Sequence, residues 1–352
     1  MTLGTILGAS FRVLRRNPRP TFGLSLLIEG ITVVLSAGVV ALVFVFAFGR
    51  ISNATSDASA ATIANGSVGL ILLAYLVPIT LSVFGLAISQ GIFSLEVARG
   101  TLGEKLTLGG LWRRSRGRMG ALIGWFWAVI GIALAIYIIF VIIVAVVIGA
   151  SAASGSGGGV AIAIVLFIVL GFGALVLAAW LIPKLSLVAP ALMIERLPLG
   201  RAIARSWTLT RGYFWRTLGI ELLVAVIINA ATSVVTAPLE IVFIAISGVF
   251  DQTGDHTTAI VIGVIVGIVG VILVVVLGAV ASVVQAATTG LLYIDLRIRK
   301  EALDLELIRF VEARQSGDTS IPDPYLSVPA RTPAPIPSTL YASPPPPPPP
   351  SA

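Results

Sequence analysis

Long apolar stretches alternate with short clusters of arginine and lysine along the whole chain. Of the 23 basic residues, all except Arg50 fall into four clusters: Arg12 to Arg19, Arg99 to Arg118, Lys184 to Arg216 and Arg297 to Arg331. A membrane-spanning helix requires about 20 apolar residues, and the stretches between the clusters are long enough. Hydrophobic residues make up 57% of the chain and charged residues 11%, which a soluble domain of this length does not need. The sequence therefore predicts a polytopic α-helical membrane protein.

The charge clusters also predict the orientation of the chain. Positive charge is retained on the cytoplasmic side of a membrane, so six spans with every cluster on one side place both termini in the cytoplasm. The first apolar run is too long for a secretory signal, and we expect an uncleaved first span. The expected spans cover about residues 22–49, 67–93, 119–150, 160–183, 217–250 and 258–294.

Three related motifs recur at intervals of about 100 residues. In Gly91-Ile-Phe-Ser-Leu-Glu96, Pro190-Ala-Leu-Met-Ile-Glu195 and Gly290-Leu-Leu-Tyr-Ile-Asp295, a small or helix-bending residue precedes an acid by five positions. A Leu-Gly pair and an arginine-rich stretch precede each odd-numbered span, and these stretches predict short amphipathic helices in the headgroup layer. The expected fold is all-α, a six-span bundle of three pseudo-repeats, each with one amphipathic helix and two spans.

Each motif places an arginine within three residues of its acid. These acids and arginines are either local ion pairs or members of a shared cluster that binds a headgroup or a partner: Glu96 and Arg99, Glu195 and Arg196, Asp295 and Arg297. The arginines of the amphipathic stretches are candidates for binding anionic lipid of the inner leaflet. They are Arg15, Arg16, Arg113, Arg114, Arg116, Arg201 and Arg205.

The run YIDLRIRKEALDL, from Tyr293 to Leu305, resembles the last-span exit of an actinobacterial family known as the glycerophosphoryl diester phosphodiesterase membrane domain. Leu3 to Pro20 and Ala189 to Phe214 are similar to the same family, so the resemblance covers most of residues 1–312. Ala302 stands where the family has glycine. The resemblance implies a bacterial plasma-membrane module without its enzyme, since a catalytic barrel of about 250 residues has no room after the sixth span.

The residues offer little for catalysis or nucleic-acid binding. The chain has no cysteine and one histidine, His256, which excludes thiolate chemistry and leaves no cluster for a metal or cofactor. Four polar residues fall inside predicted spans, where polar groups are costly and often functional. They are Glu29, Glu221, Asn229 and Glu240. Glu29 is the strongest candidate because it lies too deep in its span to reach the interface easily, and it either serves function or fixes helix packing.

The last segment of the chain, residues 313–352, is rich in proline and ends in seven consecutive prolines before Ser351. Such a composition predicts a disordered cytoplasmic tail beside the membrane domain of residues 1–312, or a docking peptide for a proline-recognising partner. Together these features predict a non-enzymatic scaffold or accessory module that engages phospholipid or a partner protein at the inner leaflet. The alternative is a small-solute or lipid transporter that uses the intramembrane polar residues.

Overall fold

The computed structural model describes residues 3–16, 19–52, 68–104, 106–153, 158–253, 256–318 and 320–326, and every regular element in these ranges is helical. In chain order the elements are α1 (Leu3–Arg16), the π-helical turn η1 (Arg19–Gly23), α2 (Leu24–Ser52), α4 (Val68–Thr101), α5 (Leu108–Ala153), α6 (Gly158–Ser186), α7 (Val188–Ile194), α8 (Leu199–Thr210), α9 (Phe214–Thr253), α10 (His256–Glu301) and α11 (Leu303–Gln315).

Six helices of the described part are long and apolar enough to cross a membrane: α2, α4, α5, α6, α9 and α10. This confirms the predicted number of spans and an all-helical, multi-pass membrane architecture. Helices suit such sequences because each one satisfies its own backbone hydrogen bonds, which lipid cannot do. Pro78, Pro183 and Pro238 lie inside α4, α6 and α9, where each removes one backbone hydrogen bond without ending the helix.

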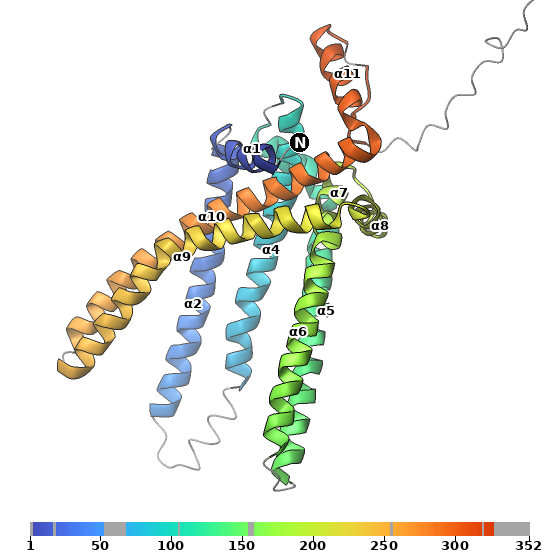
Figure 1. Cartoon of the computed structure of the whole chain (residues 1–352). Helices are drawn as coiled ribbons and strands as arrows, with labels where there is room; N and C mark the ends of the chain where they lie inside the picture. Colours follow the sequence, from blue (N-terminus) through green and yellow to red (C-terminus); the bar gives the residue numbers. More distant parts are fainter. Residues whose placement is uncertain are drawn as a thin grey trace, which may run out of the picture.

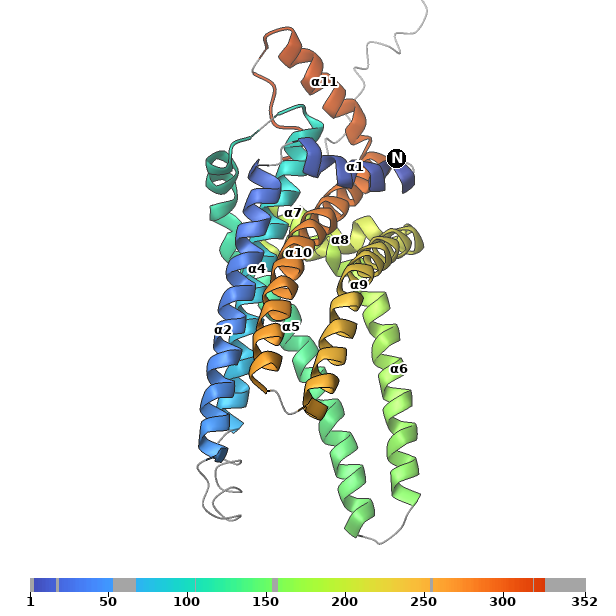
Figure 2. The same cartoon turned by 90° about the vertical axis from the view of Figure 1, so that its left-hand side faces the viewer.

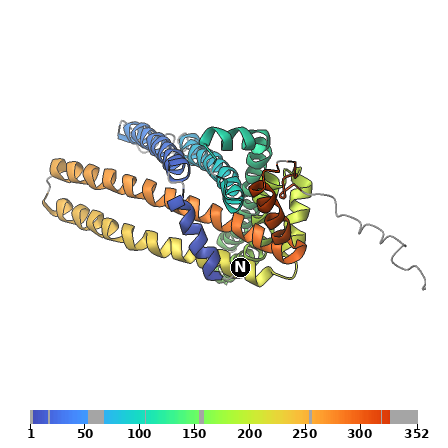
Figure 3. The same ribbon diagram turned by 90° about the horizontal axis from the view of Figure 1, so that it is seen from above.

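The long helices form pairs, in which α2 packs against α4, α5 against α6, and α9 against α10. In Figure 1 the first two pairs run side by side, whereas α9 and α10 leave at a steep slant. The pairs join at one end of the molecule, where α1, α7, α8 and α11 gather (Figures 1 and 2). We call this the polar end, because the arginine-rich segments of the sequence meet there. Viewed from above, α1 crosses over α10 at this end (Figure 3).

The hydrophobic core is concentrated at the polar end and in the adjoining halves of the spans. Its fully buried side chains include Phe93, Leu122, Leu192, Leu292 and Tyr293, which come from α4, α5, α7 and α10. Farther along the spans, large apolar side chains on both faces are exposed, as expected for helices whose surroundings are lipid rather than water.

The arginine-rich stretch before the third span does not form a separate interfacial helix. Leu108 begins α5, which continues without a break to Ala153. Leu111, Ser115 and Met119 form a buried stripe at helical spacing, while three of the intervening basic residues, Arg113, Arg114 and Arg116, are exposed. By contrast, α1 and α8 are separate helices, as the sequence predicts.

The predicted boundary of the proline-rich tail at residue 313 lies inside α11. A glycine with a φ of 86°, Gly317, ends this helix, and Asp318 N–H bonds to the Ala313 carbonyl across the turn. The chain then folds back toward α4 and α10 as far as Leu326. The remainder of the predicted tail, residues 327–352, lies outside the described residues.

The junction between α10 and α11 consists of one residue, Ala302, with a φ of 52° and a ψ of 38°. A left-handed backbone costs a non-glycine residue about 1–2 kcal/mol. Since glycine also increases the entropy of the unfolded chain, Ala302→Gly is expected to stabilise the protein by a net of about 0.5–1 kcal/mol.

The measurement is the free energy of unfolding by SDS in mixed micelles. The matched control is Ala204→Gly in the interior of α8, where glycine is expected to cost about 0.5–1 kcal/mol. If both substitutions destabilise the protein equally, Ala302 carries no backbone strain.

Candidate functional site

The three acid motifs of the sequence converge at the polar end. A Cβ added to Gly91 would meet the Met193 side chain of α7, and one added to Gly290 would lie 3.5 Å from Val97 and 3.6 Å from the Ser94 backbone. The glycine of the first motif thus leaves space for the second motif, and the glycine of the third motif leaves space for the first. This close approach packs together motifs that lie about 100 residues apart in the sequence.

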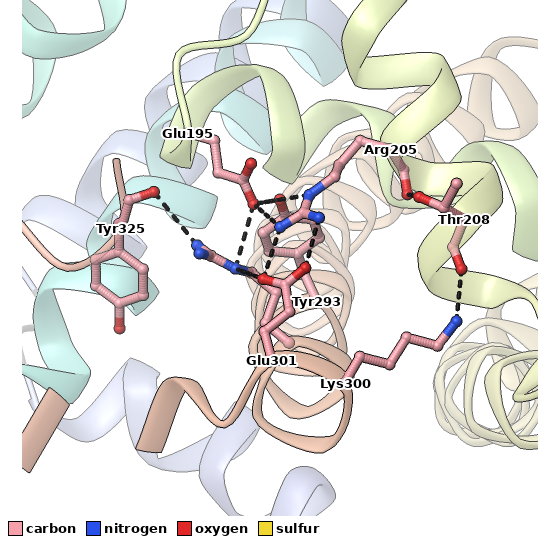
Figure 4. A network of polar contacts seen from close by, with 8 residues as sticks. Glu195, Arg205, Thr208, Tyr293, Lys300, Glu301 and Tyr325 are labelled. Carbon is pink, nitrogen blue, oxygen red and sulfur yellow. Dashed lines mark hydrogen bonds and ion pairs between the residues drawn. The ribbon is translucent and has the colours of Figure 1, made fainter. Parts of the chain in front are cut away.

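Glu195 is the centre of a buried ion-pair network (Figure 4). It follows the buried helix α7, and its side chain is only 1% exposed. One carboxylate oxygen, Oε1, accepts hydrogen bonds from Arg205 Nη2 at 3.0 Å and from the Tyr293 hydroxyl, and lies 3.2 Å from Arg297 Nε. Among the described residues, the other oxygen, Oε2, has no hydrogen-bond partner.

Glu301, the last residue of α10, completes the network. Its carboxylate contacts Arg205 Nη1 at 2.5 Å and accepts a hydrogen bond of 3.0 Å from Arg297 Nε, one helical turn earlier. Two carboxylates therefore alternate with two guanidinium groups, which balances charge where Arg297 is 5% exposed. Burial lowers the pKa of Arg205, but hydrogen bonds to Glu301 and Glu195 outweigh this effect, so its net pKa is raised and it stays charged.

Another acid, Asp295, is fully buried on α10, two residues before Arg297. Its Oδ2 accepts hydrogen bonds from Arg216 Nη2 at 3.1 Å and from Arg299 Nε at 3.0 Å. Arg216 belongs to α9, so this carboxylate links the two helices of the slanted pair. Because both arginines are partly exposed, this group of charges borders solvent on one side.

The segment that follows α11, residues 320–326, lies against α4 and α10, and we call it the strap. Tyr325 is 1% exposed, and its hydroxyl is hydrogen-bonded to Thr101 at the end of α4. The Tyr325 carbonyl accepts a hydrogen bond of 3.3 Å from Arg297 Nη1 (Figure 4). Asp323 forms an ion pair with Arg99. Burial raises the pKa of Tyr325 to about 12, so its hydroxyl stays protonated at neutral pH.

Arg99 also lies within 3.8 Å of Glu104, and the C-terminus of α4 explains why. Gly103 has a φ of 78°, which bends the chain back so that Glu104 N–H bonds to the Arg99 carbonyl. Glu104 in turn lies 3.1 Å from Arg314 and 3.9 Å from Arg114. The turn after α4 is thereby connected to both α5 and α11.

A cleft of about 950 Å³ lies between α8, the end of α10, α11 and the strap. Its volume is within the range of small-molecule sites. Charged groups of both signs line it together with apolar side chains: Glu195, Arg201, Arg205, Arg297, Glu301, Glu306, Arg309, Phe310, Ile321 and Asp323. Within the described part of the chain, no three His, Asp or Glu side chains are grouped closely enough to hold a metal ion.

The arginine candidates of the sequence fall into different environments. Arg113 and Arg116 are exposed at the start of α5, and the ion pairs of the described residues do not involve them. Arg201 is exposed beside the cleft, whereas Arg205 points into the network instead of toward headgroups. Arg114 lies near Glu104. Arg15 and Arg16 belong to α1, but their side chains lie outside the described ones.

The acid–arginine pairs of the motifs are not the neighbours in sequence. Arg297 contacts Glu195 and Glu301 instead of Asp295, and Arg99 contacts Asp323 and Glu104. Arg196 is exposed with a left-handed φ of 55°. Glu96 is buried in α4. Some of these contacts lie within one element, such as Arg297 with Glu301, whereas those of Glu195 with Arg205 and Arg297 join different helices, as in the shared cluster that the sequence left open.

The intramembrane candidates do not form one site. Glu29 lies half-buried on α2, with Oε2 only 3.4 Å from the position of a Cβ on Gly278. Glu221 is buried on α9, and neither carboxylate oxygen has a hydrogen-bond partner in the described part of the chain. Asn229 is exposed and donates to the Ala225 carbonyl at 2.8 Å, and Glu240 is exposed.

Four residues of the site were not identified as candidates from the sequence. Glu301 could have been found from its i,i+4 spacing to Arg297. Glu104, Asp323 and Tyr325 could not, because their partners lie on distant elements. Comparisons with protein-family models, with curated proteins and with solved structures found no match to this chain, so the functional proposal depends on its own residues.

Proposed function

We propose that the chain is a non-enzymatic membrane protein of the bacterial plasma membrane, whose polar end faces the cytoplasm and binds anionic phospholipid headgroups as a scaffold or accessory module. One observation carries this proposal. Arg113 and Arg116 are exposed beside the exposed Trp112, at the membrane-proximal start of α5. Exposed arginine next to tryptophan is typical of the headgroup layer, where both side chains are favourable.

Further tryptophan residues support the placement of the headgroup layer at this end of the spans. Trp215, at the start of α9, is 80% exposed. Trp180 and Trp207 pack edge to face, and Lys184 Nζ lies 4.0 Å from the Trp207 ring centroid. An ammonium group between two tryptophan rings is well placed where an apolar span meets charged headgroups. These tryptophans lie near the arginine-rich segments of the polar end, which supports our proposal that both face the same headgroup layer.

The internal repeat and the family resemblance are part of this proposal. α1 with α2 and α4, and α8 with α9 and α10, each follow the order of interfacial helix, span, span, and α5 with α6 varies it by fusing the first two elements. The left-handed backbone at Ala302 fits the glycine expected there in the glycerophosphoryl diester phosphodiesterase membrane domain family. Both points favour the membrane module of that family.

Reversing two exposed charges tests the lipid proposal. Each basic residue near an anionic surface contributes about 1 kcal/mol, so Arg113→Glu with Arg116→Glu should reduce enrichment of phosphatidylglycerol around the protein at least tenfold. The measurement is mass spectrometry of lipid retained from mixed phosphatidylglycerol and phosphatidylcholine membranes. Arg113→Lys with Arg116→Lys keeps the charge and should retain the enrichment. Unchanged enrichment in the double Glu variant overturns the proposal.

Two truncations test the role of the proline-rich segment as a docking peptide. A chain that ends after Leu326 loses residues 327–352, which include the seven consecutive prolines, but keeps Tyr325 in the core, and we expect it to fold normally and to lose its protein partner. A chain that ends after Gln315 also loses the strap and is expected to be less stable. Affinity purification in nanodiscs followed by mass spectrometry measures the partner. A partner that remains bound after truncation at Leu326 contradicts docking through the tail.

A transporter of small solutes or lipids is the second candidate, because polar groups follow the face of α2 that meets α10. Ser25 donates a hydrogen bond of 2.7 Å to the Ala279 carbonyl, and Glu29 lies against Gly278 one turn farther along. Glu29→Gln keeps the size of the side chain but removes the ionisable carboxyl group. A transporter coupled through Glu29 would lose ion-driven flux in proteoliposomes, whereas a scaffold would show no such flux in either form.

A further inference from the structure

Arg99 is a buried arginine whose hydrogen-bonding capacity is not fully used. It is 9% exposed, and its Nε has no hydrogen-bond partner among the described residues. Its ion pair with Asp323 involves only Nη2, and Glu104 lies at the longer distance of 3.8 Å. A buried guanidinium normally engages its donors in parallel pairs with a planar acceptor. The single carboxylate of the strap therefore leaves part of this site unfilled.

The strap lies between two guanidinium groups. Arg99 holds the Asp323 carboxylate, and Arg297 Nη1 donates to the Tyr325 carbonyl two residues later. Ile321 to Leu326 also form one wall of the cleft, and Arg99 itself does not line it. Moving the strap away would remove one carboxylate from the cleft and uncover Arg99, so that the cleft would gain positive charge.

We propose that Arg99 and Arg297 form an anion site for a phosphate group, that the strap occupies this site in the present conformation, and that the strap and a phosphate-bearing ligand exclude one another. This inference rests on the proposed lipid-binding function, because it makes the same polar end the place where a headgroup acts. The strap is then a gate on the cleft, and the chain continues from it into residues 327–352, which include the seven consecutive prolines.

Phosphate fits this site better than a second carboxylate. Inorganic phosphate presents four unesterified oxygens and a phosphodiester headgroup two, and each oxygen can accept more than one hydrogen bond, so the group can engage Nε and Nη2 of Arg99 together and also accept from Arg297. Its charge also compensates for the carboxylate that leaves with Asp323. Phosphate can come from a lipid headgroup or from a soluble phosphate compound, and the experiment has one arm for each source.

A labelling experiment follows the strap directly. The chain has no cysteine, so Pro324→Cys introduces a single thiol at a position that is buried within the strap. In phosphatidylcholine nanodiscs we expect slow reaction with a maleimide. Asp323→Asn in the same background should accelerate labelling at least tenfold, because Arg99 no longer holds the strap. The matched control, Asp304→Asn, changes an exposed acid of α11 and should leave the rate unchanged.

Ligands are then compared in the Pro324→Cys protein. Acceleration by inorganic phosphate over chloride at equal ionic strength identifies a soluble phosphate. Acceleration only when phosphatidylglycerol replaces phosphatidylcholine identifies a lipid headgroup. Either acceleration of labelling should disappear in the Arg99→Gln variant, which lacks the positive charge, and persist in the Arg99→Lys variant, which keeps it. Equal labelling rates under all conditions would overturn the proposal.

Hydrogen exchange on the unmodified chain provides an independent measurement, since Pro324→Cys could itself loosen the strap. Backbone amides of residues 320–326 should exchange hydrogen faster when the ligand that accelerated labelling is present. Unchanged exchange would again exclude the gate. Phosphatidylglycerol enrichment through Arg113 and Arg116 is measured separately. If enrichment is normal and the strap does not respond, only the gate is refuted. If enrichment fails, the inorganic phosphate arm still tests the site itself.

Discussion

Arg297→Gln is expected to lower the free energy of unfolding by about 3–5 kcal/mol, the usual cost of removing one partner from a buried ion pair. Arg297 supports two carboxylates and the Tyr325 carbonyl. Without it, Glu195 keeps Arg205 and Tyr293 but remains buried with less compensating charge. Unfolding by SDS in mixed micelles, followed by circular dichroism, provides the measurement.

Arg299→Gln is the matched control, because Arg299 lies on the same helix and is hydrogen-bonded to Asp295. Its side chain is partly exposed, and Asp295 also has Arg216, so we expect a loss of about 1 kcal/mol or less. Equal losses for the two variants would show that the Glu195 network does not hold the polar end together. A double-mutant cycle of Glu195→Gln and Arg297→Gln then isolates their coupling from the loss of other contacts.

Tyr325→Ala is expected to release the strap. Removing a buried aromatic side chain costs about 3–5 kcal/mol, which corresponds to a population of the released strap roughly 150-fold to 5,000-fold higher. Because the strap follows the six spans in the chain and is covalently joined to them through α11, we expect this cost to appear as local opening while the spans stay folded. Hydrogen exchange of the strap and of the end of α4 near Thr101 measures the opening.

Tyr325→Phe separates the ring from its hydroxyl. This variant keeps the buried ring and loses only the hydrogen bond to Thr101, so the expected cost is about 0.5–1.5 kcal/mol. A strap that opens equally in the Ala and Phe variants would mean that the hydroxyl, and not ring burial, holds it. No change in either variant would contradict a docked strap.

The spans could be predicted from the sequence because hydropathy is a local property. Runs such as Val160 to Pro183 have no ionisable residue, so few structures other than a spanning helix can bury them. The lengths of the helices were less predictable. Leu108 to Arg118 carries an amphipathic pattern, which suits an interfacial helix and the first turns of α5 equally well. Contacts of Leu111 and Met119 with the core decide between these possibilities.

The partners of the charged residues required the tertiary structure. The sequence places Arg297 two residues from Asp295, yet on α10 its side chain lies against Glu195 of a distant element. Arg205 was expected beside lipid headgroups because it lies on the cationic face of an amphipathic helix. In the structure its guanidinium group instead forms ion pairs with Glu195 and Glu301. Coulomb interactions depend on distance in space, and no local pattern specifies which acid lies nearest once six spans have packed.

The sequence by itself determined that this is a helical membrane protein with six spans, because the transfer of apolar side chains from water depends on composition alone. It also determined which segments carry positive charge, and these segments meet at the polar end. Only the tertiary structure decided that Tyr325, at the edge of a proline-rich segment, is a core residue. Tyr325 is buried because it contacts the ends of α4 and α10 together, and these two helices lie side by side only in the folded chain.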